Sequence, residues 1–186
     1  MIDKADTRIE GEPAGPDDWN PAHFKRLGSL AGLLHRVGQH YTGPVGHDLD
    51  DWDCIPEAQL VETLPDDERN LPDLNRRVHE HLAALPRHPG TYGPVHYDLH
   101  AGNYLLTADD RLVLFDFENS CRAHYLNDIA VTFYYARLHK LTTDRAAFRA
   151  PFFEAFWAGY AGEYPVPEAE LDSLPWFVLN RSLIVY

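Results

Sequence analysis

The sequence reads His96-Tyr97-Asp98-Leu99-His100-Ala101-Gly102-Asn103 just past its midpoint and Leu114-Phe115-Asp116-Phe117-Glu118 shortly afterwards. A carboxylate such as that of Asp98 can orient a reacting hydroxyl group and take up its proton. The amide oxygen of Asn103 and the carboxylate of Asp116 are hard oxygen donors, the kind that Mg²⁺ prefers. Because four residues separate Asp98 from Asn103, one loop can direct both side chains into the same cleft. The two stretches therefore predict a general base beside a magnesium site.

The segment between these two stretches has the pattern of a β-hairpin. Short apolar runs at 104–106 and 112–115 flank the polar turn sequence Thr107-Ala108-Asp109-Asp110. An apolar run, a polar turn and a second apolar run are typical of two antiparallel strands. A tight hairpin returns the chain on itself, so we expect Asp116 to arrive beside Asn103.

The spacing of these residues also matches a catalytic pattern. Kinase catalytic loops have the form H-x-D-x-x-x-x-N, and a metal-binding Asp-Phe pair follows them. Phosphoryl transfer chiefly requires an acceptor hydroxyl held in line and neutralisation of the phosphate charge by magnesium. The sequence therefore predicts an ATP-dependent phosphotransferase with Asp98 as its base. A metal-dependent hydrolase is a weaker alternative, because His96, Asp98 and His100 would share one face of a strand and could bind zinc.

Most of the remaining chain has helical periodicity. Asn20 followed by Pro21 predicts a helix start, and apolar residues then recur every three or four positions as far as Gly38. Residues 126–139 are apolar almost all round, which predicts a central, buried helix. We expect further helices at 57–63, 71–85, 144–160 and 168–186, loops at 6–22 and 41–57, a turn at 86–94, and a return to helix after Cys121. The expected fold class is α+β and mainly helical.

Composition and charge narrow the class of partner. The 186-residue chain is 45% hydrophobic and has a formal net charge of −13. A negative field of this size repels nucleic acid and anionic membranes and favours a cationic substrate. The acidic run Asp48, Asp50, Asp51 and Asp53 is either a surface that attracts such a substrate or a solvated loop.

The chain shows no sign of export or membrane insertion. Met1 to Asp6 contain no apolar segment of the signal-peptide type, and no apolar run reaches the roughly 18 residues of a membrane span. The two cysteines, Cys54 and Cys121, lack the spacing of a zinc site and are too few for a disulfide framework. We therefore expect a reduced, cytoplasmic protein.

The motif residues resemble those of the aminoglycoside phosphotransferase family, which includes choline and homoserine kinases. Residues 96–103 are similar to its H-G-D-L-H-x-G-N signature, residues 127–130 to its D-[IL]-A segment, and residues 27–35 to its L-G-x-x-L-A-x-L-H helix. The resemblance implies a protein-kinase-like C-terminal lobe, with a short catalytic β-hairpin, over residues 23–186. Residues 1–22 would be a hinge-like segment and loop, and the N-terminal lobe that covers ATP would be absent from this chain.

The resemblance also implies roles for individual residues. Asp98 would be the catalytic base, Asn103 and Asp116 would bind Mg²⁺, and a hinge would contact the adenine of ATP through Asp3, Lys4 and Ala5. A supporting set would shape the loop: His96, His100, Glu118 and Asp128. Within this set, we expect His96 to support the backbone and Asp128 to accept hydrogen bonds from the loop N–H groups.

The sequence departs from the family pattern at two positions. Tyr97 replaces the usual Gly, which either adds bulk at the floor of the site or points into the core, and Glu118 stands where Asp or Gly is more usual. The expected partners are a small, amine-bearing and cationic hydroxyl acceptor and a missing N-lobe, with no nucleic acid and no membrane. The alternative reading is a truncated, non-catalytic binding module.

Overall fold

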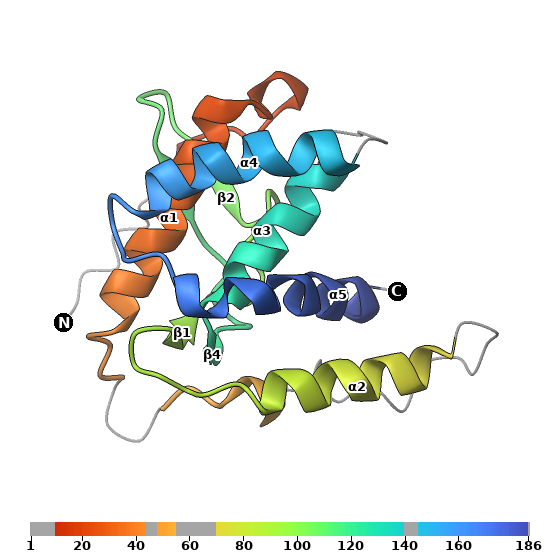
Figure 1. The fold of residues 1–186 in the computed structure, drawn as a ribbon. Coiled ribbons are helices and arrows are strands. Elements are labelled where there is room, and N and C mark those ends of the chain that lie inside the picture. The colour runs from red at the N-terminus through yellow and green to blue at the C-terminus, as the bar shows by residue number, and fades with distance from the viewer. Residues whose placement is uncertain (1–9, 44–47, 55–69, 140–144, 186) are drawn as a thin grey trace.

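A computed structural model describes residues 10–43, 48–54, 70–139 and 145–185 of the chain. Its architecture is mainly helical with two small antiparallel sheets, so the expected fold class is confirmed (Figure 1). The helices are α1 (Pro21–Gly38), α2 (Leu71–Ala83), α3 (Leu126–His139), α4 (Arg145–Tyr160) and α5 (Leu174–Ile184). The strands are β1 (Tyr92–Val95), β2 (Tyr104–Leu106), β3 (Leu112–Leu114) and β4 (Cys121–His124). Within the described ranges, no helix is long and apolar enough to cross a bilayer.

Helix α1 begins where the sequence predicts. The side-chain oxygen of Asn20 accepts hydrogen bonds from the backbone N–H groups of Ala22 at 3.0 Å and His23 at 3.2 Å. These bonds satisfy two N–H groups that have no partner within the helix. Pro21 occupies the first helical position, where a missing N–H costs nothing.

Helices α1 and α4 lie side by side (Figure 1) and approach closely at two glycines. A Cβ atom on Gly28 would lie 1.9 Å from the carbonyl oxygen of Phe156, and one on Gly159 would lie 1.9 Å from that of Lys25. The hydroxyl of Ser29 also donates to the carbonyl of Gly159 at 3.3 Å. Small residues therefore set the distance between these helices.

Helix α3 runs through the centre of the molecule, as its composition predicts. Nine of its residues are buried, and α5 packs against it on the side that faces α2 (Figure 1). Two charged residues, Asp128 on α3 and Arg181 on α5, are buried on these helices.

The predicted hairpin is present. Strands β2 and β3 pair in antiparallel register, with Tyr104 opposite Leu114 and Leu106 opposite Leu112. The preceding segment runs along the free edge of β2, because Glu12 and Leu106 exchange two backbone hydrogen bonds of 2.9 and 2.8 Å. The loop expected at 6–22 is thus tied to the hairpin where the structure describes it.

Three sequence predictions were wrong at element boundaries. Residues 92–95 form a strand rather than a turn, and residues 121–124 form its antiparallel partner rather than a helix. Each strand has only four residues, and β1 contains Gly93 and Pro94, which weaken a strand signal. Residues 168–173 form a 3₁₀ helix, and α5 starts only at Leu174, where Pro175 suits a first helical turn. The helix expected at 57–63 lies outside the described residues.

Candidate active site

The loop of residues 96–103 connects β1 to β2 and carries Asp98. Its carboxylate is held on both oxygens. Oδ2 lies 3.2 Å from Nε2 of His100 and accepts a hydrogen bond from the amide of Asn103 at 3.2 Å, while Oδ1 accepts one from the guanidinium of Arg181. Burial by itself would raise the pKa of Asp98, but the His100 hydrogen bond and the Arg181 charge outweigh it and lower the pKa to about 2. Asp98 is therefore a carboxylate at neutral pH.

Asn103 joins the loop to the segment that carries Asp116. Its side-chain N–H group donates to the carbonyl of Asp98 at 2.9 Å, which leaves the amide Oδ1 as the atom that could bind a cation. Its own carbonyl accepts the N–H of Phe115 at 2.9 Å, and Asp116 follows Phe115 directly in the sequence. Asp116 is exposed and has a positive φ of 64°. The hairpin thus brings these two predicted metal ligands together.

His96 is fully buried beneath this junction. Its Nε2 donates to the carbonyl of Phe115 at 2.9 Å, and its Nδ1 accepts the N–H of Asp98 at 3.3 Å. The ring therefore links Asp98 to the segment that carries Asp116 through backbone atoms. Because both ring nitrogens are used in this way, His96 has none left for zinc. No group of three or more metal-binding side chains occurs in the described part of the chain, so the structure does not support the hydrolase alternative.

Asp128 holds the start of the loop from below. One carboxylate oxygen accepts the N–H of His96 at 3.0 Å, and the other accepts that of Tyr97 at 2.8 Å. A second contact comes from α1, where His35 Nε2 lies 3.3 Å from Asp128, and the hydroxyl of Tyr160 lies 2.8 Å from His35 Nδ1. Sequence reasoning assigned no site role to His35, although the family-like segment 27–35 ends on it.

Tyr97 has a left-handed backbone, with φ at 70°. Glycine adopts this conformation without strain, which gives a physical reason for the glycine at this position in the family signature. The side chain of Tyr97 is 3% exposed and belongs to the hydrophobic core. Of the two options left open by the sequence, the structure shows the one in which Tyr97 points into the core.

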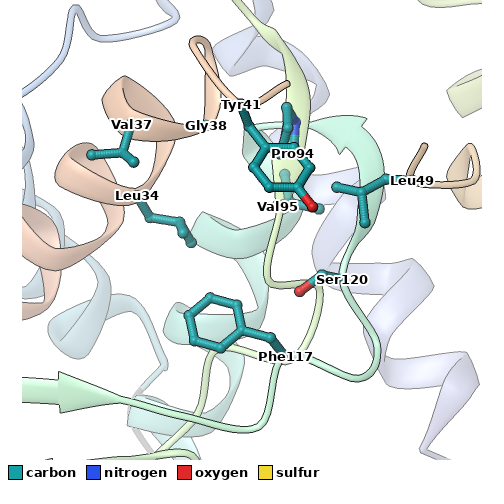
Figure 2. A pocket seen from close by; sticks show the side chains of 9 residues that line it. All are labelled: Leu34, Val37, Gly38, Tyr41, Leu49, Pro94, Val95, Phe117 and Ser120. Carbon is teal, nitrogen blue, oxygen red and sulfur yellow. The ribbon is translucent and has the colours of Figure 1, made fainter. Parts of the chain in front are cut away.

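Phe117 borders an apolar hollow of about 390 Å³ (Figure 2). Its ring is 50% exposed and lies 4.9 Å from that of His96. The walls of the hollow come from the end of α1, from the chain after α1, from β1 and from the segment after Phe117: Leu34, Val37, Gly38, Tyr41, Leu49, Pro94, Val95 and Ser120 (Figure 2). An apolar surface therefore adjoins the segment that carries Asp116.

The remaining predicted site residues are placed as follows. His100 contacts Asp98 as described above, and its Nδ1 also accepts the N–H of Gly102 at 2.9 Å. Glu118 is exposed beyond Phe117. The adenine contacts predicted at Asp3, Lys4 and Ala5 lie outside the described residues.

The acidic run is partly engaged within the protein. Asp51 and Asp53 form ion pairs with Arg87 at 2.8 and 2.9 Å, and Asp51 also accepts the hydroxyl of Tyr92 at 2.6 Å. Asp51 thereby ties the loop to β1 and Asp53 ties it to Arg87, while Asp48 and Asp50 are exposed, as is Asp53. Asp48 and Asp50 therefore remain for the acidic surface that one reading of the sequence assigned to the whole run, a surface that would attract a cationic substrate.

The donor set suits a divalent cation together with a phosphate chain. Asn103 provides an amide oxygen whose orientation is fixed by Asp98, and Asp116 provides an exposed carboxylate. Both are oxygen donors of the type that Mg²⁺ prefers, and one or two protein oxygens suffice when phosphates and water complete the coordination. The residues therefore fit the metal that the motif implies.

Comparison with known proteins agrees with this geometry. The model of a family described as "Phosphotransferase enzyme family" matches residues 5–170. The chain is 28% identical over 183 residues to amicoumacin kinase of Bacillus subtilis (strain 168), a match covering 96% of this chain and 54% of that protein. The chain spans about half the length of the curated relatives it matches.

Solved structures show the same fold. The amicoumacin kinase hAmiN, in complex with AMP-PNP, Ca²⁺ and Ami, superposes with a TM-score of 0.88 at 26% identity, over 96% of this chain and 54% of that one. The aminoglycoside phosphotransferase APH(3'')-Id of Streptomyces rimosus superposes with a TM-score of 0.67 at 20% identity, over 95% of this chain and 67% of that one. The resemblance drawn from residues 96–103 is therefore confirmed at the level of family and fold.

Proposed function

Since the chain belongs to the phosphotransferase enzyme family, we propose that it supplies the catalytic lobe of an ATP-dependent kinase acting on a hydroxyl group of a small molecule. The observation that carries the proposal is that Asn103 is hydrogen-bonded both to Asp98 and to Phe115, the residue directly before Asp116. Asn103 donates to Asp98 through its side chain and accepts from Phe115 through its backbone. A base and two metal ligands then share a single rigid junction.

In the proposed reaction, the acceptor oxygen forms a bond to the γ-phosphorus of ATP as the bond to the β-phosphate oxygen breaks. Asp98 orients the acceptor hydroxyl and receives its proton late in the transfer. A pKa of about 2 makes Asp98 a weak base, which suits a loose transition state in which the proton leaves after the phosphorus–oxygen bond has broken. Asn103 and Asp116 would hold Mg²⁺, which supplies neutralisation of the phosphate charge.

The acceptor is proposed from charge and from the relatives. The net charge of −13 favours a cationic, amine-bearing molecule. The relatives named above are kinases of amicoumacin and of aminoglycosides, and another structure of this fold is a microcompartment-associated aminopropanol kinase. We propose an amine-bearing alcohol or antibiotic of this class.

Domain roles and location complete the proposal. Residues 23–186 form the catalytic lobe, and residues 1–22 form a hinge in which Asp3, Lys4 and Ala5 contact adenine. The lobe that covers the nucleotide would lie outside residues 1–186. We further propose a cytoplasmic location, since ATP is the phosphate donor.

Two measurements test this function: calorimetric titration of the chain with Mg-ATP, and a coupled assay for ADP over a panel of amino alcohols and aminoglycosides, with the chain joined to the lobe that covers the nucleotide. Asp98→Asn should abolish transfer, because the amide cannot take the proton. Asp172→Asn, at an exposed position of the 3₁₀ helix before α5, is the matched control and should keep wild-type turnover. Full turnover by Asp98→Asn would contradict the assignment of the base, whereas nucleotide binding without transfer to any acceptor would favour a non-catalytic binding module.

A further inference from the structure

Arg181 is a charged residue that the kinase motif does not include. It lies on α5, is 9% exposed, and donates from a single guanidinium nitrogen, Nη2, to Oδ1 of Asp98 and to the hydroxyl of Tyr135, the latter at 2.9 Å. Its guanidinium also lies 5.1 Å from the centre of the Tyr135 ring. Three separate elements thus meet at this cation: the loop after β1, helix α3 and helix α5.

The two oxygens of the Asp98 carboxylate are contacted by different residues. Arg181 holds Oδ1, while His100 and Asn103 hold Oδ2, each at 3.2 Å. The centres of the His100 and Tyr135 rings lie 4.7 Å apart, so the residues that contact the two oxygens also contact each other. A carboxylate contacted on both oxygens has one orientation, and that orientation sets the direction from which an acceptor hydroxyl can approach.

We propose that Arg181 is a positioning residue for Asp98 and that it orients the base toward the acceptor hydroxyl. The inference rests on the proposed function, because it assigns a task to the base of that reaction. The proton of the acceptor passes to Asp98, and Arg181 keeps its own proton throughout. Misplacing a catalytic group by about 1 Å can reduce turnover by roughly 100-fold. Removal of Arg181 should therefore reduce kcat much more than it changes KM.

The test compares Arg181→Ala and Arg181→Lys in the assay for transfer. We expect Arg181→Ala to lower kcat by about 100-fold and to change the KM of the acceptor less than about threefold. Arg181→Lys should recover part of the loss, since a lysine keeps the ion pair but loses the planar fork. Millimolar guanidinium chloride should also raise the kcat of Arg181→Ala, whereas sodium chloride at the same ionic strength should not. A wild-type kcat for Arg181→Ala would overturn the proposal.

The chain offers a matched control on α3. Arg137 lies 5.5 Å from the centre of the Tyr134 ring, a similar contact between arginine and tyrosine, and among the described residues it forms no ion pair with a carboxylate. Arg137→Ala should keep the wild-type kcat. If Arg137→Ala lost as much kcat as Arg181→Ala does, removal of any arginine on this side of the lobe would have the same effect. The positioning role of Arg181 would then be wrong.

A second measurement does not require turnover. Urea unfolding of Arg181→Ala, Asp98→Asn and the double variant forms a thermodynamic cycle between the two side chains. We expect the unfolding constant of the double variant to differ from the product of the single effects by about tenfold or more, as is typical of residues in one ion pair. If the effects of the two substitutions on the unfolding constant simply combine, Arg181 and Asp98 do not interact, and the proposal is wrong. If residues 1–186 joined to the lobe that covers the nucleotide phosphorylate no acceptor, the proposed function fails, while this cycle still decides whether Arg181 holds Asp98.

Discussion

The carboxylate of Asp128 accepts the backbone N–H of Tyr97 at 2.8 Å, at the residue where the loop of residues 96–103 turns into a left-handed conformation. The adjacent N–H of His96 bonds to the other carboxylate oxygen at 3.0 Å. A left-handed residue other than glycine costs about 1–2 kcal/mol. A charged acceptor that takes two backbone N–H groups contributes more than this, because each such bond is worth about 1.5–3 kcal/mol. Asp128 therefore fixes the turn that places Asp98.

The first prediction concerns this carboxylate. Asp128→Asn should destabilise the protein by about 2–4 kcal/mol. The asparagine has a single side-chain oxygen, so its NH₂ group would face one of the two backbone N–H groups, which would stay unbonded in the core. Urea unfolding followed by tryptophan fluorescence measures the change. Turnover should also fall, since the loop that carries Asp98 loses an anchor.

The matched control is Asp110→Asn in the hairpin turn. Asp110 also has a positive φ, at 64°, which asparagine tolerates, and it forms an exposed ion pair with Arg26 at 3.0 Å. Exposed pairs contribute less than about 1 kcal/mol, so this variant should unfold almost as the wild type does. Equal destabilisation of the two variants would mean that burial of Asp128 has no special effect.

The second prediction concerns Tyr97 itself. Tyr97→Gly relieves the left-handed strain of about 1–2 kcal/mol but removes a buried aromatic ring, a loss of about 3–5 kcal/mol. The net result should be a destabilisation of about 1–4 kcal/mol, seen as a lower urea midpoint. A stabilised variant would show that the ring contributes little to the core and that the strain dominates.

The local part of the site could be predicted from the sequence, whereas its long-range part could not. Asn103 and Asp116 are joined by a hairpin whose strands and turn are contiguous in the sequence. The pattern of apolar and polar residues was therefore sufficient to predict that the two residues lie close together. Arg181 contacts Asp98 across 83 residues, and nothing in the periodicity of α5 marks it. His35 was missed for the same reason, because its partner Asp128 lies on another helix. Strands β1 and β4 were missed because each has only four residues, too few to show a clear alternation of apolar and polar side chains. Strand β1 also contains Gly93 and Pro94, which are unusual in strands.

The third prediction concerns the contact between α1 and α4. Gly28→Ala and Gly159→Ala each place a methyl group 1.9 Å from a backbone carbonyl, which a side-chain rotation cannot relieve. The helices must move apart, at a cost of about 1–3 kcal/mol or more, and the gain in helix propensity of at most about 1 kcal/mol does not offset it. Thermal unfolding measures the loss. Gly90→Ala is the control, since no atom lies within 4 Å of its Cβ position, and it should unfold at the wild-type temperature.

The fourth prediction concerns pH and the buried imidazole of His23. Its Nε2 lies 3.0 Å from the hydroxyl of Tyr104, and burial, reinforced by Arg26 and opposed by Asp18, lowers its pKa from 6.5 to about 4. The unfolded chain therefore binds a proton as the pH falls below 6.5, whereas the folded chain does so only near pH 4. Stability is fully present above pH 6.5 and decreases between pH 6.5 and 4. Since one pKa unit corresponds to about 1.4 kcal/mol, His23 should account for a loss of roughly 2 kcal/mol between pH 7.5 and 5.

Urea unfolding at half-unit steps from pH 7.5 to pH 4.5 measures this loss. His23→Gln keeps a hydrogen-bonding group near Tyr104 but cannot titrate, so its stability should fall less steeply over the same window. Burial also lowers the pKa of His79 and His139, so part of the slope should persist in His23→Gln. Tyr104→Phe removes the hydroxyl partner and leaves His23 buried, so it should keep the wild-type slope at a lower overall stability. Identical pH profiles for His23→Gln and wild type would place the proton uptake at another group, because only a titrating His23 makes the two curves converge toward pH 4.5.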